Sequence, residues 1–294
     1  MNAILVRQRT RALVALSLAF AACNKPNRTV ATGRDSTAPT DSIAPVASGI
    51  RDYVVSANDY AFRGLPLHAP AGWLTFRMPN DGRETHMLAI AAVPRGYTVP
   101  AFTDSLVRQK LPNGTKFWPG VDVVSPGDSG VVTVFLPAGQ YAAICFVQSA
   151  DGTRHVQKGM IGSFDVVASA DTGTSDYVDA VVTLSPRHIR IAGPELKKGV
   201  RTIRVASSNT QPQDFQLVKL RPGRSAQDAL KWFVNRNTVA PAAEALGGVS
   251  EIYAGQKATM TVNFTPGDYL LFFQLDGTDK RPKFAQLALT IPSR

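Results

Sequence analysis

From residue 52 onward, the chain consists of short apolar runs separated by glycine, proline, asparagine and aspartate. Within residues 73–78, Leu74, Phe76 and Met78 alternate with other residues, and this period of two places them on one face of a strand. Turn signals stand at 80–82, 126–128 and 137–139, and only residues 104–111 have a helical pattern. Many short strands joined by such turns predict an all-β sandwich or barrel. The strands expected in the first half are 53–57, 73–78, 86–93, 131–136, 141–148 and 161–167.

The length of 294 residues is enough for about two domains. Because 44% of the residues are hydrophobic and 18% are charged, most of the chain is expected to fold around a core. The formal net charge is +10, but the basic residues are scattered and the longest basic run is Lys197-Lys198. This distribution argues against a nucleic-acid partner.

The N-terminus has the pattern of an export signal over residues 1–22. A basic segment contains Arg7, Arg9 and Arg11, and the apolar run 12–22 that follows is shorter than the roughly 20 residues that span a bilayer. The run ends at Cys23 and resembles a bacterial lipoprotein signal, although Phe20 stands where that signal usually has leucine. The resemblance implies lipidation of Cys23 and a place in the bacterial cell envelope, anchored to the membrane and facing the periplasm or the exterior. The alternative is ordinary cleavage that leaves Cys23 unmodified.

Residues 23–50 are polar and lack a periodic pattern, so we expect a flexible tether after the lipidated cysteine. Residues 51–168 form the first predicted domain, 169–176 a linker, and 177–294 a second domain. The second domain parallels the first: residues 80–88 match 209–217, residues 136–141 match 264–269, and Trp118 and Trp232 both fall in long connecting segments. This order indicates one fold used twice.

Four side chains of the first domain have metal-binding chemistry: His86, Cys145, His155 and Met160. Two imidazoles and a thiolate in one plane with a distant thioether describe a blue-copper site for electron transfer. Each residue also has a structural explanation, since a lone histidine, cysteine or methionine is often part of a core. The evidence for a metal site is that all four residues occur together.

The first domain resembles a cupredoxin, the plastocyanin-like family of type 1 copper proteins. In that family the first histidine follows an asparagine-containing turn, as His86 follows Asn80, and the other ligands come late, after a Pro/Ala-Gly turn and a tyrosine. Here residues 137–139 and Tyr141 precede Cys145. The resemblance implies two tandem Greek-key β-sandwiches, with one copper held by His86, Cys145 and His155 in the plane and by Met160 on the axis.

One spacing departs from the family pattern. The second histidine usually follows the cysteine closely, whereas nine residues, 146–154, separate Cys145 from His155. Asp151-Gly152 within this stretch is a turn signal, so the loop either folds back to deliver His155 or holds it away from the thiolate.

The second domain lacks the ligands. Phe215 is predicted to stand where the first domain has His86, and Phe273 where it has Cys145. That domain is therefore predicted to bind no metal.

These patterns predict an electron carrier that is not an enzyme and that docks transiently with redox proteins of unknown identity. The chain has four histidines, which are too few for the additional copper centres of nitrite reductases or laccase-type oxidases. Two alternatives remain open: a metal-free binding or scaffold lipoprotein, and a protein that holds or delivers copper.

Overall fold

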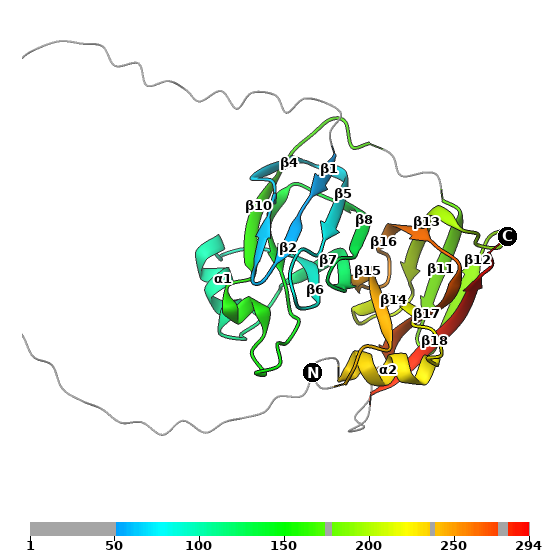
Figure 1. Ribbon diagram of the computed structural model, residues 1–294. Helices are drawn as coiled ribbons and strands as arrows, with labels where there is room; N and C mark the ends of the chain where they lie inside the picture. Colours follow the sequence, from blue (N-terminus) through cyan, green and yellow to red (C-terminus); the bar gives the residue numbers. More distant parts are fainter. Residues whose placement is uncertain (1–50, 174–177, 236–238, 276–281, 294) are drawn as a thin grey trace, which may run out of the picture. The chain divides into compact units, whose positions relative to one another are not determined.

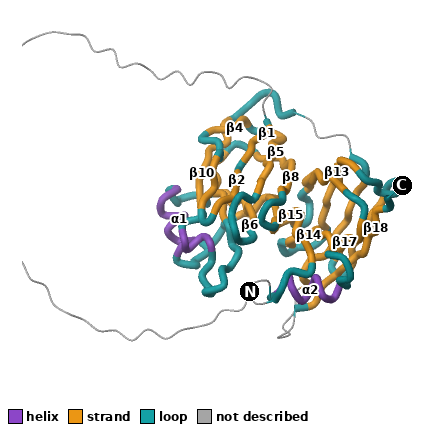
Figure 2. Tube along the Cα trace, in the orientation of Figure 1, coloured by secondary structure: helices purple, strands orange, loops and turns teal. Residues whose placement is uncertain are grey.

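The computed structural model describes residues 51–173, 178–235, 239–275 and 282–293. Most of this part of the chain is β-strand (Figures 1 and 2). The predicted signal peptide, Cys23, the tether and residues 174–176 of the predicted linker lie outside the described residues. No helix in the described ranges is both long and apolar enough to cross a membrane.

The elements of the first half are β1 (Asp52–Val54), β2 (Ser56–Asn58), β3 (Ala61–Arg63), β4 (His68–Pro70), β5 (Gly72–Pro79), β6 (His86–Ala92), α1 (Val99–Val107), β7 (Lys116–Val124), β8 (Ser129–Leu136), β9 (Gly139–Ile144), the 3₁₀ turn η1 (His155–Lys158) and β10 (Ile161–Val167). Those of the second half are β11 (Ala180–Ser185), β12 (His188–Ala192), β13 (Gly199–Ser207), β14 (Gln213–Leu220), α2 (Ala226–Val234), β15 (Ala243–Ile252), β16 (Lys257–Phe264), β17 (Gly267–Leu275) and β18 (Lys283–Ile291).

The first half is a sandwich of two sheets. One sheet contains β1, β5 and β8, and the other contains β7, β6, β9, β10 and β4 in that order. The alternation expected in β5 is confirmed, because Leu74, Phe76 and Met78 are buried while Arg77 is exposed. These buried side chains form part of the core between the sheets.

The second half repeats the first. The order β13–β14–α2–β15–β16–β17–β18 matches β5–β6–α1–β7–β8–β9–β10. One internal hydrogen bond recurs: the Tyr141 hydroxyl donates to the Pro137 carbonyl at 2.8 Å, and the Tyr269 hydroxyl donates to the Thr265 carbonyl at 2.7 Å. The prediction of one β fold used twice is confirmed.

The two halves share both of their sheets. Antiparallel pairing of β8 with β16 makes a seven-stranded sheet, and antiparallel pairing of β7 with β15 makes a nine-stranded one. Each junction joins a strand to its own counterpart, since β15 repeats β7 and β16 repeats β8.

Four sequence-based predictions need correction. The helix begins at Val99 rather than 104, because Thr98 caps it with its side chain and a proline occupies its first turn. The predicted strand 53–57 is divided between β1 and β2, and the predicted strand 141–148 ends at Ile144. Trp118 lies in strand β7 whereas Trp232 lies in helix α2, so these two residues are not equivalent.

The counterpart of His86 is also different from the one predicted. Ala92 pairs with Tyr141 in the first half and Lys219 pairs with Tyr269 in the second, so Ala92 and Lys219 are equivalent. Counting back by the same number of residues from Ala92 and from Lys219 makes Gln213 the equivalent of His86. Phe215 is then level with Leu88, an ordinary core position.

Candidate metal centre

The structure brings three of the four predicted ligands together. His86 is the first residue of β6, Cys145 directly follows β9, and His155 opens η1. One donor atom from each residue lies within 4.8 Å of the other two. All three residues are completely buried at the end of the sandwich core.

The long loop between Cys145 and His155 folds back on itself. Ser149 N–H donates to the Thr153 carbonyl at 2.9 Å, and Gly152 turns the chain with a φ of 81°. Beyond this turn, His155 N–H donates to the Val147 carbonyl at 2.8 Å. The loop is therefore closed by backbone hydrogen bonds, and its extra length still places the His155 ring against the sulfur.

The three donor atoms form a compact triangle. The Nδ1 atoms of His86 and His155 are 3.0 Å apart, and Cys145 Sγ lies 3.4 Å from the His155 nitrogen and 3.9 Å from the His86 nitrogen. A point in their plane is about 2.0 Å from all three, near the usual metal–nitrogen distance and slightly inside the metal–sulfur distance of about 2.3 Å. The triangle therefore fits a three-coordinate metal ion with little movement.

Each imidazole has a carboxylate on its other nitrogen. His86 Nε2 lies 2.8 Å from Asp59 Oδ1, and His155 Nε2 lies 2.9 Å from Glu84 Oε2. Since an ionised carboxylate only accepts hydrogen bonds, both Nε2 atoms carry the proton and donate it. In neutral rings, both Nδ1 lone pairs then face each other at 3.0 Å, a repulsive arrangement that a cation between them relieves.

Burial keeps these rings neutral. Loss of solvent lowers the pKa of both His86 and His155, and this effect outweighs the hydrogen bonds that the two rings donate to Asp59 and Glu84, which would raise the two values. Neutral imidazole is the form that binds a metal ion. The buried rings are thus ready to act as ligands.

The Met160 backbone is hydrogen-bonded to two of the other three residues. Its N–H donates to the His155 carbonyl at 2.9 Å, and its carbonyl accepts from Cys145 N–H at 3.2 Å. The residue is completely buried. The axial role of its thioether stays a prediction.

Two observations of topology agree with the resemblance found in the sequence. The cysteine follows a strand that starts at a Pro-Ala-Gly turn, and the first histidine opens the neighbouring strand of the same sheet. Both features are ones that the resemblance to a cupredoxin implies.

Comparisons with known proteins gave solved structures only. No protein-family model and no curated protein matches the chain. Among the similar structures is a reduced auracyanin from Roseiflexus castenholzii, 17% identical, with 40% of this chain and 98% of that one aligned at a TM-score of 0.31. A blue copper oxidase from Nitrosomonas europaea is 15% identical, with 82% of this chain and 85% of that one aligned at a TM-score of 0.26.

The cluster of His86, Cys145 and His155 has a second layer that the sequence did not reveal. Glu84, in the turn before β6, accepts hydrogen bonds from His155 Nε2 at 2.9 Å and from the Tyr60 hydroxyl at 2.7 Å. The Tyr60 ring stands edge-on to the His155 ring at 4.9 Å, and Lys158 Nζ lies 4.5 Å from the Tyr60 ring centroid. Asp59, Glu84 and Tyr60 therefore complete the site.

The second half has different residues at the ligand positions. Gln213 replaces His86 and Phe273 replaces Cys145, and both are buried. The remaining histidines, His68 and His188, are exposed and lie outside the described cluster. Lipidation of Cys23 stays a prediction, because the residue lies outside the described part of the chain.

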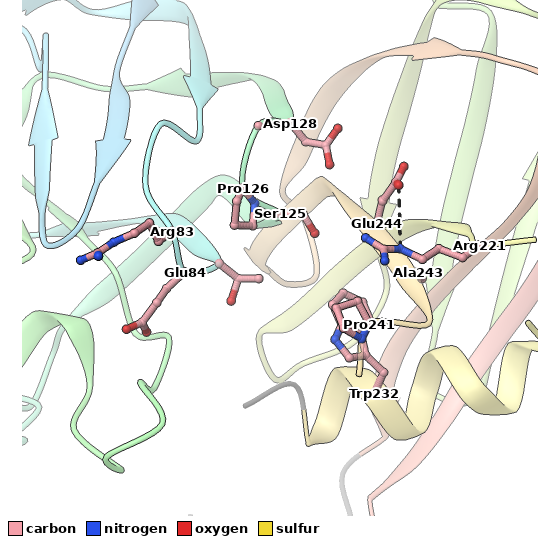
Figure 3. Close-up of a pocket in the computed structure, with 12 residues that line it drawn as sticks. Arg83, Glu84, Ser125, Pro126, Asp128, Arg221, Trp232, Pro241, Ala243 and Glu244 are labelled. Carbon is pink, nitrogen blue, oxygen red and sulfur yellow. Dashed lines mark ion pairs between the residues drawn. The ribbon is translucent and has the colours of Figure 1, made fainter. Parts of the chain in front are cut away.

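A cleft of about 530 Å³ is lined in part by Glu84. Figure 3 shows Trp232 on one side with the Arg221–Glu244 ion pair above it, while the Glu84 carboxylate points away from them. Burial and the neighbouring Glu244 carboxylate raise the pKa of Asp128, at the top of the cleft in this view, to about 6. The carboxylate that holds His155 is therefore separate from the charges of the cleft.

Proposed function

We propose that this protein binds one type 1 copper ion and transfers single electrons through it. The observation that carries the proposal is the triangle of His86 Nδ1, His155 Nδ1 and Cys145 Sγ around a point about 2.0 Å from each atom. Two imidazoles and one thiolate are the donor set that copper electron-transfer sites use.

The residues of the centre suit this chemistry. Copper bound there would supply a one-electron change, while the protein keeps its donors in place. Met87 N–H lies 3.5 Å from Cys145 Sγ and donates a hydrogen bond to it, which supports the thiolate form. Because all three donors are completely buried, water and substrates have little access to the metal position.

Burial also favours a carrier over an enzyme. An oxidase or a nitrite reductase needs an open coordination position and further copper ligands. In the described part of the chain, His86, Cys145 and His155 form one candidate cluster, and the two other histidines are exposed. A site closed to substrates can still exchange electrons with a transiently docked redox protein.

We further propose that the protein is exported and anchored by lipid on Cys23 at the bacterial envelope. The support is the basic and apolar N-terminal pattern that ends at this cysteine. Labelled fatty acid should enter the wild-type protein in cells and should not enter Cys23→Ala. Equal labelling of both proteins would contradict the anchor.

Absorption spectroscopy tests the copper site. One equivalent of Cu(II) added to the purified protein should give intense visible absorption from charge transfer between thiolate and copper. Cys145→Ala should stay colourless, while His68→Ala, which changes an exposed histidine, should colour like wild type. A colourless wild-type protein would overturn the proposal and leave the metal-free scaffold. Colour together with rapid loss of copper to a chelator would instead favour copper delivery.

A further inference from the structure

Two carboxylates from different segments face the two ligand imidazoles. Asp59 lies between β2 and β3, and Glu84 lies two residues before β6. Each accepts a hydrogen bond from the Nε2 of one ring, at 2.8 and 2.9 Å. A hydrogen bond on this nitrogen fixes which ring nitrogen is free to bind metal, and it also makes that nitrogen more basic.

Both carboxylates are themselves held by neighbours. Asp59 Oδ1 accepts from Arg83 N–H at 3.0 Å, and Glu84 Oε1 accepts from the Tyr60 hydroxyl at 2.7 Å. The Asn80 amide donates to the carbonyls of Glu84 and Val124, each at 2.9 Å, and so ties the turn to β7. The carboxylates are therefore fixed parts of the structure that keep both Nδ1 atoms within the triangle formed with the sulfur.

The charge of these groups affects the choice of oxidation state. The side chains of aspartate and glutamate ionise well below neutral pH. Asp59 and Glu84 each accept a hydrogen bond from one ligand imidazole, and with the thiolate these two carboxylates surround the metal position with negative charge. Such charge stabilises a divalent ion more than a monovalent one.

We infer that Asp59 and Glu84 are positioning residues that hold both imidazoles in the Nε2–H form and shift the preference of the centre from Cu(I) toward Cu(II). This inference rests on the proposed copper site and goes beyond it, because it states which oxidation state the two carboxylates stabilise. The shift lowers the reduction potential of the bound copper, so the reduced centre gives up its electron more readily than it would without the two carboxylates.

Metal affinities test the effect of charge. Asp59→Asn and Glu84→Gln keep the shape and an acceptor oxygen but remove the charge. Each should weaken Cu(II) binding by about 10- to 100-fold, measured by competition with chelators. Cu(I) binding should weaken much less, so the Cu(II)/Cu(I) affinity ratio should fall at least about tenfold, which raises the reduction potential by about 59 mV. Asp104→Asn removes an exposed carboxylate on α1 and should leave the ratio unchanged.

The metal-free protein tests positioning independently. Nitrogen-15 NMR of the histidine rings should show Nε2–H for both His86 and His155. Asp59→Ala and Glu84→Ala remove the acceptor and should shift the facing ring toward Nδ1–H, whereas the Asn and Gln variants should keep Nε2–H.

Nδ1–H rings in the metal-free wild type would overturn positioning, and an unchanged affinity ratio in protein that binds copper would overturn the charge effect. Failure of wild type to bind any copper would overturn the proposed function instead, and the ring protons would still decide positioning.

Discussion

At the scale of single residues, Gly82 shows how closely the ligands and their carboxylates are packed. A β-carbon at this position would collide with the Asp59 carboxylate and lie 2.6 Å from His86 Nε2. Gly82 N–H also donates to the Asn80 side chain at 3.0 Å, which keeps the turn close to the site. The glycine is needed here because nothing larger fits.

Gly82→Ala should therefore push Asp59 away from His86 and weaken Cu(II) binding about tenfold or more, the usual cost of disturbing an outer-layer partner. Chelator competition measures the loss, and circular dichroism checks that the protein is folded. Gly139→Ala is the matched control, because a β-carbon there makes only an ordinary contact with the Tyr141 ring at 3.5 Å. Equal affinities in wild type and Gly82→Ala would refute this account.

Residue type and order were enough to predict the three donors that converge. Soft and borderline ligands in a fixed order carry their chemistry in the sequence itself. Asp59 and Glu84 gave no such signal, because carboxylates in turns are usually solvated and these contacts join residues far apart in the chain. Similarly, aligning the turns placed Phe215 opposite His86, whereas the strand register assigns Gln213 to that position, since the two turns differ in length.

At the scale of elements, the sequence predicted most strands of the first half but not β7, which is buried on both faces. β5 alternates between buried and less buried residues, which is the period-two signal. The last six residues of β7 are all buried, so the strand lacks the period-two alternation. It also contains Pro119-Gly120, a pair that is typical of turns. The pattern of this segment therefore predicts a connection, although β7 is the strand of the nine-stranded sheet where the two halves meet.

The turn between β7 and β8 contains a carboxyl group whose titration should be measurable. Burial and Glu244 raise the pKa of Asp128 from 3.8 to about 6, so between these values the folded protein binds more protons than the unfolded chain. The contribution of Asp128 to the free energy of unfolding should therefore be greatest below pH 4 and fall as the pH rises to about 6.

Denaturant unfolding of wild type and Asp128→Asn at several pH values isolates this effect. The stability of wild type relative to the variant should fall between pH 4 and pH 6 and then stay constant, because the amide does not titrate. A difference that is independent of pH would show that the carboxyl group titrates normally in the folded protein.

At the scale of the whole molecule, the two halves are joined by more than chain connectivity. Across β7 and β15, Ser125 N–H donates to the Ala245 carbonyl at 2.8 Å and Ala245 N–H donates to the Ser125 hydroxyl at 2.9 Å. The Gln216 side chain adds a hydrogen bond to the Val123 carbonyl at 2.9 Å. The sequence indicated a repeat but not this junction, because hydrogen bonding between repeats leaves no pattern in either one.

The shared sheets allow a prediction about the oligomeric state of the first half when it is produced as a separate fragment. A fragment of residues 51–173 would expose the edges of β7 and β8, and unpaired edges of this kind pair with other strands. In the whole chain their partners are their own repeats, β15 and β16, in antiparallel register. A second copy of the fragment offers the same edges in the same arrangement. The fragment should therefore form a symmetric dimer, visible by sedimentation equilibrium.

Thr133→Lys places a charge on the β8 edge opposite Thr259 and should shift the fragment toward monomer. A wild-type fragment that is monomeric at every concentration would mean that these edges are protected by something other than the second half.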